Sequence, residues 1–308
     1  MGDTTDKNTA PVHDRRLTPV RDDLVGEPFQ DQFPDLPAAT GISMVCAASV
    51  SALMKAPSLT AGRETELLFG EPFTVYEQHS GWAWGQSGLD GYVGYVAGGD
   101  LVPFDAPATH RINVLRTLVF SAPDIKSVPF GFVSMNALLR VTGEADGTPQ
   151  FLAIALPGNK QGYVIADHCC DANDKHQDYV SLAAYYLHAP YLWGGRSSLG
   201  LDCSALVQNA LTCARGIVPG EPPILRDTDM QETSIGKNVE GEPKDAMRGD
   251  RLKRGDLIFW KGHVAIMCDE TNILHANGTH MAVSVDPLDD FAARVLTTTG
   301  PVTSIKRP

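Results

Sequence analysis

The chain has 308 residues, of which 25 are Lys or Arg and 37 are Asp or Glu, so its formal net charge is −12. This length and composition are typical of a globular protein of two or three domains. Binding to a nucleic-acid backbone requires clustered Lys and Arg, and the longest basic cluster here is Arg15-Arg16, so we expect no nucleic-acid partner.

Neither the N-terminus nor any later segment has the character of a membrane anchor. The first 24 residues are polar and charged, and no apolar run approaches the roughly 20 residues that span a bilayer. We therefore expect a cytoplasmic protein without a membrane partner. The six cysteines are too few for a disulfide scaffold and show no C-x-x-C pair for structural zinc, so we interpret them as mostly reduced thiols.

The first third of the chain predicts an arm followed by a small β domain. Residues 1–36 contain several prolines among many charges, which indicates an N-terminal arm, extended or partly disordered, to which we assign no chemistry. Residues 37–105 then contain short apolar or aromatic runs separated by glycine-containing turns. The runs are Leu67–Phe69, Phe73–Tyr76, Trp82–Trp84 and Tyr92–Val96. Short strands at this spacing predict a β-barrel or sandwich.

Residues 106–170 show a similar pattern. Strands are predicted at 114–115, 137–141, 151–155 and 162–166, and Gly162-Tyr163-Val164 repeats Gly91-Tyr92-Val93. The repeat indicates a duplicated module, although two tripeptides can match by chance. His168-Cys169-Cys170, with Asp171 and His176, offers metal-binding atoms, but vicinal cysteines lack the usual ligand spacing, so we interpret this segment as an interdomain linker.

Residues 171–308 change to helices followed by strands. A helix is predicted at 180–187, and a second at 203–215, where apolar residues recur every three to four positions and Gly216 can end the helix. Four strands are predicted at 256–260, 263–268, 273–277 and 281–285. A helix followed by an antiparallel meander is an α+β arrangement.

Cys203 is the candidate nucleophile. It stands at the start of the second helix, where free backbone N–H groups and the helix dipole favour a thiolate. It is flanked by polar Asp202 and Ser204, and it follows the glycine-rich turn Trp193-Gly194-Gly195. A small buried thiol is the alternative interpretation, which we keep for Cys46, Cys213 and Cys268.

A nucleophilic cysteine needs a base and a group that orients this base. His263 and His275 lie in successive predicted strands, and a three-residue turn through Cys268–Glu270 would place them directly opposite each other on one face. We expect a thiolate–imidazolium pair between Cys203 and His263. The histidines without such pairing, interpreted as structural, are His79, His110, His176 and His188.

Six segments in this order resemble the NlpC-type cell-wall peptidases, small relatives of the papain-like cysteine peptidases. The segments are Tyr191–Gly195, Leu201–Gln208, Arg226–Gln231, Arg254–Trp260, Gly262–Ile266 and Ile273–Ala276. The resemblance implies a papain-like catalytic domain over 171–308, in which Cys203 is the nucleophile, His263 the base and then the acid, and His275 the group that fixes His263. It also implies that the Cys203 N–H and the Tyr191 hydroxyl surround the oxyanion and that Asp202 and Ser204 border the substrate, with no metal and no cofactor.

The resemblance extends to the front of the chain. Some members carry two bacterial SH3-like barrels, which would correspond to 37–105 and 106–170, and cut free murein peptides between D-glutamate and the diamino acid. In those members the first barrel lends a glutamate and a tyrosine to hold the free α-amine of L-Ala. This implies Glu64 and Tyr92, although Glu66 could face the site instead, and it leaves the second barrel as a spacer.

The leading hypothesis is therefore a cytoplasmic cysteine peptidase that trims murein tripeptides or longer stem peptides. One alternative is a hydrolase of intact peptidoglycan that uses the barrels as wall anchors. Another is a non-enzymatic module in which Cys203, His263 and His275 bind zinc and the barrels bind a peptide. The sequence does not decide between diaminopimelate and lysine at the leaving position.

Overall fold

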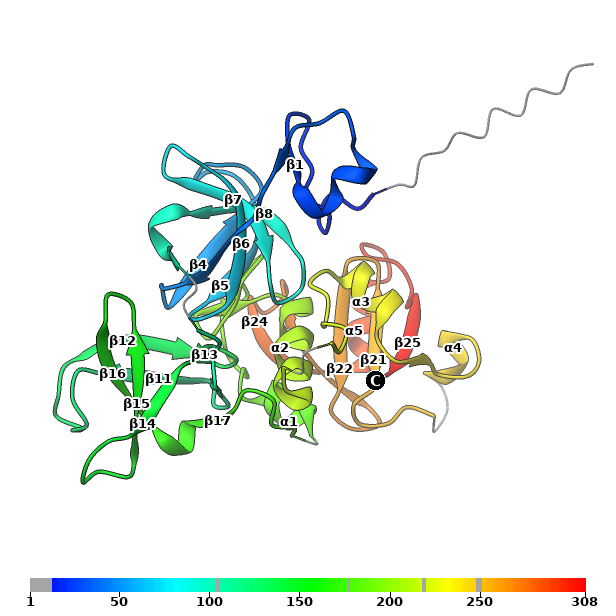
Figure 1. Cartoon of the computed structure of the whole chain (residues 1–308). Helices are drawn as coiled ribbons and strands as arrows, with labels where there is room; N and C mark the ends of the chain where they lie inside the picture. Colours follow the sequence, from blue (N-terminus) through cyan, green and yellow to red (C-terminus); the bar gives the residue numbers. More distant parts are fainter. Residues whose placement is uncertain (1–12, 104–105, 177, 218–219, 248–250) are drawn as a thin grey trace, which may run out of the picture.

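The computed structural model describes residues 13–103, 106–176, 178–217, 220–247 and 251–308. These residues form two small β domains and one mixed domain (Figure 1). The first β domain, blue to cyan, and the second, green, both lie beside the mixed domain that contains α2.

The first β domain is a seven-stranded antiparallel sheet in the order β5-β4-β8-β7-β6-β3-β9. Leu53, Leu67, Phe73 and Val96 form its buried core, as the apolar runs of the sequence predict. Its strands are β3 (Ile42–Cys46), β4 (Val50–Met54), β5 (Arg63–Leu68), β6 (Pro72–His79), β7 (Trp82–Ser87), β8 (Val93–Ala97) and β9 (Leu101–Pro103).

The N-terminal segment packs on this barrel. It contains β1 (Val25–Gly26) and β2 (Ala38–Ala39), which pair in parallel, and the 3-10 helix η1 (Glu27–Gln32). The carbonyl of Arg16 accepts a hydrogen bond from the N–H of Val93 at 2.7 Å, and Leu17 packs against the barrel core. The described part of the predicted arm is therefore folded, whereas residues 1–12 lie outside the described residues.

The second β domain combines a five-stranded sheet, β12-β11-β16-β15-β14, with a three-stranded sheet, β13-β10-β17. Residues 114–115, predicted as a strand, instead connect β10 to β11. The strands are β10 (His110–Ile112), β11 (Arg116–Phe120), β12 (Pro129–Ser134), β13 (Leu138–Leu139), β14 (Val141–Glu144), β15 (Phe151–Leu156), β16 (Lys160–Ile165) and β17 (Cys169–Asp171).

The cysteine pair belongs to this domain. Cys169 and Cys170 lie in β17 and pair with Ile112 and Arg111 of β10, so the interpretation as a linker is wrong. The segment forms a strand because its backbone completes the three-stranded sheet. Among the residues that the structure describes, no group of three or more His, Cys, Asp or Glu side chains is arranged to hold a metal ion.

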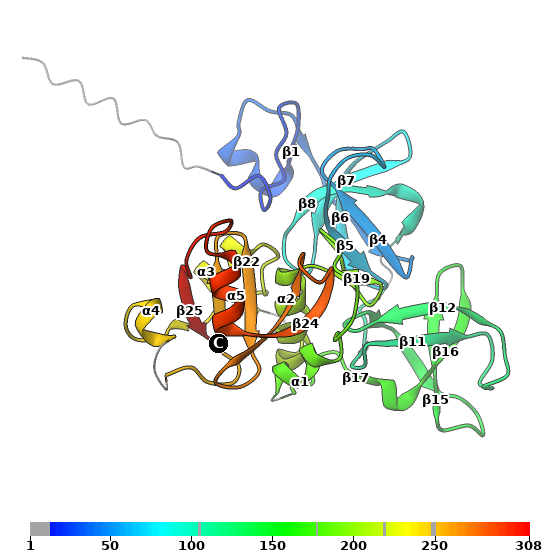
Figure 2. The same ribbon diagram turned by 180° about the vertical axis from the view of Figure 1, so that it is seen from behind.

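The mixed domain is built on a six-stranded antiparallel sheet in the order β20-β25-β21-β22-β23-β24. Helix α2 (Cys203–Arg215) covers one face and α5 (Leu288–Val295) the other (Figure 2). The remaining elements are α1 (Tyr179–Ala184), β18 (Arg196–Ser197), β19 (Gly200–Leu201), α3 (Thr228–Ser234), β20 (Lys237–Asn238), α4 (Pro243–Ala246), β21 (Leu257–Trp260), β22 (His263–Met267), β23 (Asn272–Asn277), β24 (Ala282–Pro287) and β25 (Ser304–Arg307).

The predicted elements of this domain are confirmed to within about three residues. Alternation along the central strands explains the two cores: Val264 and Ile266 face α2, while Ala265 and Met267 face α5. Helix α5 and strand β25 were not predicted; α5 packs on one face of the sheet, and β25 pairs with β20 and β21 within it.

Buried polar contacts join the β domains to the mixed domain. Arg196 bonds both carboxylate oxygens of Glu71 at 2.8 and 2.6 Å, and both side chains are 1% exposed. From the second β domain, the Asn136 amide donates to the carbonyl of Asn209 in α2 at 2.9 Å.

Within the described residues, no helix combines the length and apolar character needed to cross a membrane.

Candidate active site

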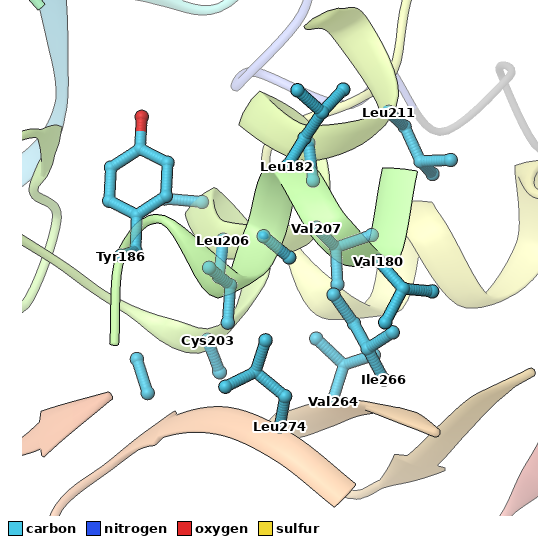
Figure 3. Packing of buried hydrophobic residues seen from close by; sticks show 14 of the residues in the cluster. Val180, Leu182, Tyr186, Cys203, Leu206, Val207, Leu211, Val264, Ile266 and Leu274 are labelled. Atoms are coloured by element: carbon cyan, nitrogen blue, oxygen red, sulfur yellow. The ribbon is translucent and has the colours of Figure 1, made fainter. Parts of the chain in front are cut away.

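Helix α2 begins at Cys203, which places this thiol at the helix N-terminus. Asp202 is the N-cap, and its Oδ1 accepts the N–H of Ala205 at 2.9 Å. Figure 3 shows the Cys203 side chain between α2 and the sheet, near Leu206 and Leu274. The residue is 6% exposed. The prediction that a helix begins at Cys203 is thus confirmed, while its role as nucleophile stays a prediction.

The imidazole rings of His263 and His275 are in direct contact. Nε2 of His263 lies 2.9 Å from Nδ1 of His275. The prediction that the two residues are directly opposite is wrong, because Ile266 pairs with Leu274 and the two histidines are therefore diagonal neighbours. The connecting loop is longer than the predicted turn, with Cys268 N bonded to the carbonyl of Asn272 at 2.8 Å. A shift of two residues keeps both rings on one face.

Aromatic packing holds these rings. Phe291 of α5 lies edge-on to His275 with ring centroids 4.4 Å apart, and it lies 5.3 Å from the ring of His263. Trp260 pairs with His263 from the neighbouring strand β21, and the ring centroids of the two side chains are 5.8 Å apart. The rings are therefore fixed between the sheet and α5.

Burial favours the neutral forms of Cys203 and His263. It raises the pKa of the Cys203 thiol to about 12, and the charge of Asp202 adds to this shift. It lowers the pKa of His263 to about 3, with a further contribution from His275. The expected thiolate–imidazolium pair is thus not the favoured state, because desolvation outweighs the helix start.

The Cys203 thiol contacts the backbone at the start of β22. The backbone N–H of Val264, the residue after His263, interacts with the Cys203 sulfur and lowers its pKa in part. Among the described residues, no hydrogen bond joins the Cys203 thiol directly to the imidazole of His263. Such bonds are often long before substrate is bound.

Tyr191 lies near the nucleophile. Burial raises the pKa of its hydroxyl, and the charge of Cys203 raises it further, so the two side chains are electrostatic neighbours. Its backbone N–H bonds the carbonyl of Met281 at 2.9 Å. This position is compatible with the predicted contact to an oxyanion, which stays a prediction.

Asp202 and Ser204 are held by a buried arginine. Arg226, 1% exposed, bonds Oδ2 of Asp202 at 2.7 Å, Oδ1 at 2.9 Å and the Ser204 hydroxyl at 2.8 Å. What the structure shows for Asp202 and Ser204 is therefore capping and anchoring of the helix start. Their contact with substrate stays a prediction, and the role of Arg226 was missed although it begins one of the six segments.

Tyr92 connects two carboxylates from different domains. Its hydroxyl lies 3.2 Å from Oε2 of Glu64 in the first barrel and 3.0 Å from Oδ2 of Asp227 in the mixed domain. Glu66 is instead buried and accepts bonds from Arg63 and from the Arg196 N–H, both at 2.9 Å. Of the two candidate glutamates, Glu64 is the one beside Tyr92.

The N-terminal segment also reaches this cluster. Arg16 pairs with Asp227 at 2.8 Å, with Asp229 at 2.7 Å and with Asp14 at 2.7 Å. Sequence reasoning missed both Arg16 and Asp227. Asp227 directly follows Arg226 within a matched segment, which is a usable signal, whereas Arg16 carries none.

Comparison with known proteins agrees with this geometry. Residues 53–101 match the bacterial dipeptidyl-peptidase Sh3 domain, and residues 188–298 match the NlpC/P60 family. Dipeptidyl-peptidase 6 of Lysinibacillus sphaericus is 28% identical over 266 residues, which are 81% of this chain and 93% of that protein. Gamma-D-glutamyl-L-lysine dipeptidyl-peptidase of Bacillus cereus (strain ATCC 10987) is 30% identical over 120 residues, 36% of this chain and 32% of that protein.

A solved structure supports the fold. The NlpC/P60 family protein from Bacillus cereus ATCC 10987 matches with a TM-score of 0.68 at 19% identity and covers 86% of this chain and 99% of that chain. The NlpC/P60 match contains Cys203, His263 and His275, and the Sh3 match contains Tyr92. This chain accordingly carries an NlpC/P60 cysteine peptidase domain, matched over 188–298, behind a bacterial dipeptidyl-peptidase Sh3 domain, matched over 53–101, and it is homologous to dipeptidyl-peptidase 6.

Proposed function

We propose that this peptidase hydrolyses the bond between γ-D-glutamate and the diamino acid in free murein peptides that begin with L-Ala. The observation that carries the proposal is the contact of the Tyr92 hydroxyl with Glu64 and Asp227, one carboxylate from each domain. The names of the relatives, a dipeptidyl-peptidase and a gamma-D-glutamyl-L-lysine dipeptidyl-peptidase, support it.

The carboxylate cluster suits an ammonium group. Glu64 is half-buried, and within the described part of the chain it has no cationic partner. Around it, Arg16 is shared by three further carboxylates, those of Asp14, Asp227 and Asp229. The excess of negative charge favours the free α-amine of an N-terminal L-Ala by a charge-assisted hydrogen bond.

A short path of buried contacts connects this cluster to the nucleophile. Asp227 directly follows Arg226 in the sequence. Arg226 donates hydrogen bonds to both carboxylate oxygens of Asp202, the residue before Cys203. The proposal requires that a peptide whose amine is held at Tyr92 present one particular carbonyl to the thiol. For L-Ala-γ-D-Glu followed by a diamino acid, that carbonyl is the γ-carbonyl of D-glutamate.

The reaction then proceeds in two stages. The Cys203 sulfur attacks the γ-carbonyl as its proton passes to Nδ1 of His263, the nitrogen that does not face His275. The Cys203 N–H and the Tyr191 hydroxyl stabilise the oxyanion. Collapse breaks the amide bond, and the leaving amine takes the proton from His263.

Hydrolysis of the resulting thioester completes the cycle. A water molecule gives a proton to His263 and attacks the thioester carbonyl, which releases L-Ala-γ-D-Glu and returns the proton to the Cys203 sulfur. Because burial favours the neutral thiol and imidazole, the first proton transfer accompanies the attack and does not precede it.

The test compares free L-Ala-γ-D-Glu-diaminopimelate with its N-acetylated form, with cleavage followed by mass spectrometry. The ammonium contact is worth roughly 1.5–3 kcal/mol, so we expect the free peptide to be cut at least about tenfold better in kcat/KM. Glu64→Gln and Tyr92→Phe should each narrow this gap, while Glu144→Gln, which alters an exposed carboxylate of the second barrel, should leave it unchanged. Cys203→Ala should abolish cleavage.

The competing functions predict other outcomes. Equal rates on both peptides, or efficient solubilisation of intact sacculi, would support the hydrolase of polymeric peptidoglycan. Stoichiometric zinc without any cleavage would support the zinc-binding module. The lysine-containing tripeptide, assayed in parallel, identifies the preferred leaving group, and cell fractionation tests the cytoplasmic location.

A further inference from the structure

A third side chain continues the row formed by His263 and His275. In the register of β23 with β24, Ser284 lies opposite His275 and Asp286 lies opposite Ile273. Asp286 is therefore the diagonal neighbour of His275, just as His275 is the diagonal neighbour of His263. The three residues lie on one straight diagonal across three adjacent strands and on the same face of the sheet.

The carboxylate of Asp286 is held firmly in this row. It is 7% exposed, and Oδ2 lies 3.6 Å from Nε2 of His275. Arg294 of α5 also bonds Oδ2, and Nε2 of His280 lies 3.1 Å from Oδ1. Arg294 is one helical turn beyond Phe291, the residue that packs against both imidazole rings. Helix α5 thus fixes the carboxylate and the rings together.

Nε2 of His275 is a buried nitrogen without a hydrogen-bond partner among the described residues. The charged group beside it is the Asp286 carboxylate, 3.6 Å away. A neutral imidazole carries its proton on one nitrogen only. If the proton were on Nδ1, a bare lone pair of Nε2 would face the carboxylate and be repelled. With the proton on Nε2, the N–H dipole points to negative charge and is stabilised.

We propose that Asp286 is a positioning residue that selects the Nε2–H tautomer of His275 and, through it, the tautomer of His263. The Nδ1 lone pair of His275 then accepts the Nε2–H of His263, at the observed 2.9 Å. This leaves the lone pair of His263 on Nδ1, free to take the proton of Cys203. In the opposite arrangement Nδ1 of His263 already carries a proton and cannot act as a base.

The first experiment reads the tautomers directly. Nitrogen-15 NMR of the histidine-labelled full chain at pH 7, with His263→Gln and His275→Gln to assign the signals, should show Nε2–H at both rings. Asp286→Leu should move the His275 proton to Nδ1, and Asp286→Asn, which keeps an oxygen acceptor, should retain Nε2–H. Asp290→Asn, an exposed carboxylate on α5, is the matched control. A wild-type ring of His275 protonated on Nδ1 overturns the proposal without any variant.

The second experiment separates positioning from general structural damage. Asp286→Leu should lower kcat on the tripeptide at least about tenfold with KM changed less than about twofold, and in a His275→Gln background it should have no further effect on kcat. An equal loss in both backgrounds would show that Asp286 does not act through His275. This arm depends on the proposed substrate, whereas the NMR arm needs none, so failure of the substrate proposal leaves the tautomer assignment testable.

Discussion

At the scale of single residues, the site places its reactive groups where water is scarce. Burial raises the pKa of Cys203 and lowers that of His263, so that at neutral pH the thiol keeps its proton and the imidazole can accept it. Because burial lowers the pKa of His263, its imidazole stays neutral, and so able to accept a proton, over a wider pH range than a free histidine. Because the thiol is neutral, the nucleophilic thiolate of Cys203 forms only during the attack on the substrate.

Alkylation by iodoacetamide tests this arrangement without any substrate. If the thiol is neutral, the rate at Cys203 should rise about tenfold per pH unit through neutral pH, with no plateau between pH 4 and 8, because the thiolate fraction rises in this way below the pKa. Cys203→Ala corrects for the other thiols. A flat rate across that interval would instead show a thiolate–imidazolium pair.

His275 offers a second test at this scale. Its proposed task is to accept the N–H of His263, whose Nε2 lies 2.9 Å from Nδ1 of His275, and thereby to orient the ring. His275→Asn and His275→Gln retain an acceptor and should lower kcat less than His275→Ala, by a factor of at least about three. Equal kcat values for the three variants would contradict an orienting role.

The sequence predicted these residues because their chemistry is local. Cys203 follows polar Asp202 at a helix start, and the two histidines lie in adjacent strands of one hairpin, whose alternation places both rings on the same face. Asp286 and Asp227 could not be found in the same way. Each is an ordinary acidic residue whose role depends on the register of another strand or on contact with another domain.

At the scale of elements, the loop between β22 and β23 determines which residues meet. Oδ1 of Asp269 accepts the N–H groups of Thr271 and Asn272, both at 2.8 Å. These bonds close the loop 268–272 between the paired Met267 and Ile273, which is two residues longer than the predicted turn, and this moves the register by two residues. Strand periodicity predicted the face of His263 and His275 correctly, since it does not depend on loop length.

Replacing Asp269 should weaken this loop. Asp269→Ala removes several hydrogen bonds at an exposed site, and we expect the free energy of unfolding in urea to fall by about 1–2 kcal/mol. The amide of Asn272 lowers the pKa of Asp269 to about 2, so the contribution is present above the ordinary pKa near 3.8 and is lost as the pH falls to 2. Asp290→Ala, on the exposed face of α5, should change nothing. Equal stability of the Asp269 variant and wild type at pH 7 would contradict this role.

At the scale of the whole molecule, a buried ion pair and buried hydrogen bonds join the β domains to the peptidase domain. The pair of Arg196 with Glu71 is fully enclosed, and Arg226 also bonds the Thr65 hydroxyl of the first barrel at 2.8 Å. The alternating apolar pattern predicted each domain but gave no account of these joints. Charged residues are normally expected at the surface, so sequence patterns do not reveal that they pair inside an interface.

Breaking one joint should therefore destabilise the molecule. Arg196→Met leaves Glu71 buried without a cation and should cost roughly 3–5 kcal/mol, seen as a lower thermal midpoint. Arg196→Met combined with Glu71→Leu should recover at least half of the loss. Arg254→Met, which breaks an exposed pair with Asp178, should cost at most about 1 kcal/mol. A similar loss for the buried and the exposed pair would contradict the assignment.

The ion pair between Arg16 and Asp227 also has a consequence for biosynthesis. Its two partners are 211 residues apart in sequence, so Arg16 leaves the ribosome long before the residue that it binds has been made. The first barrel can fold early, but the acidic cluster around Tyr92 is assembled only when the peptidase domain arrives. If this cluster binds the α-amine as proposed, a nascent chain lacks the complete amine-binding site until translation has passed Asp227.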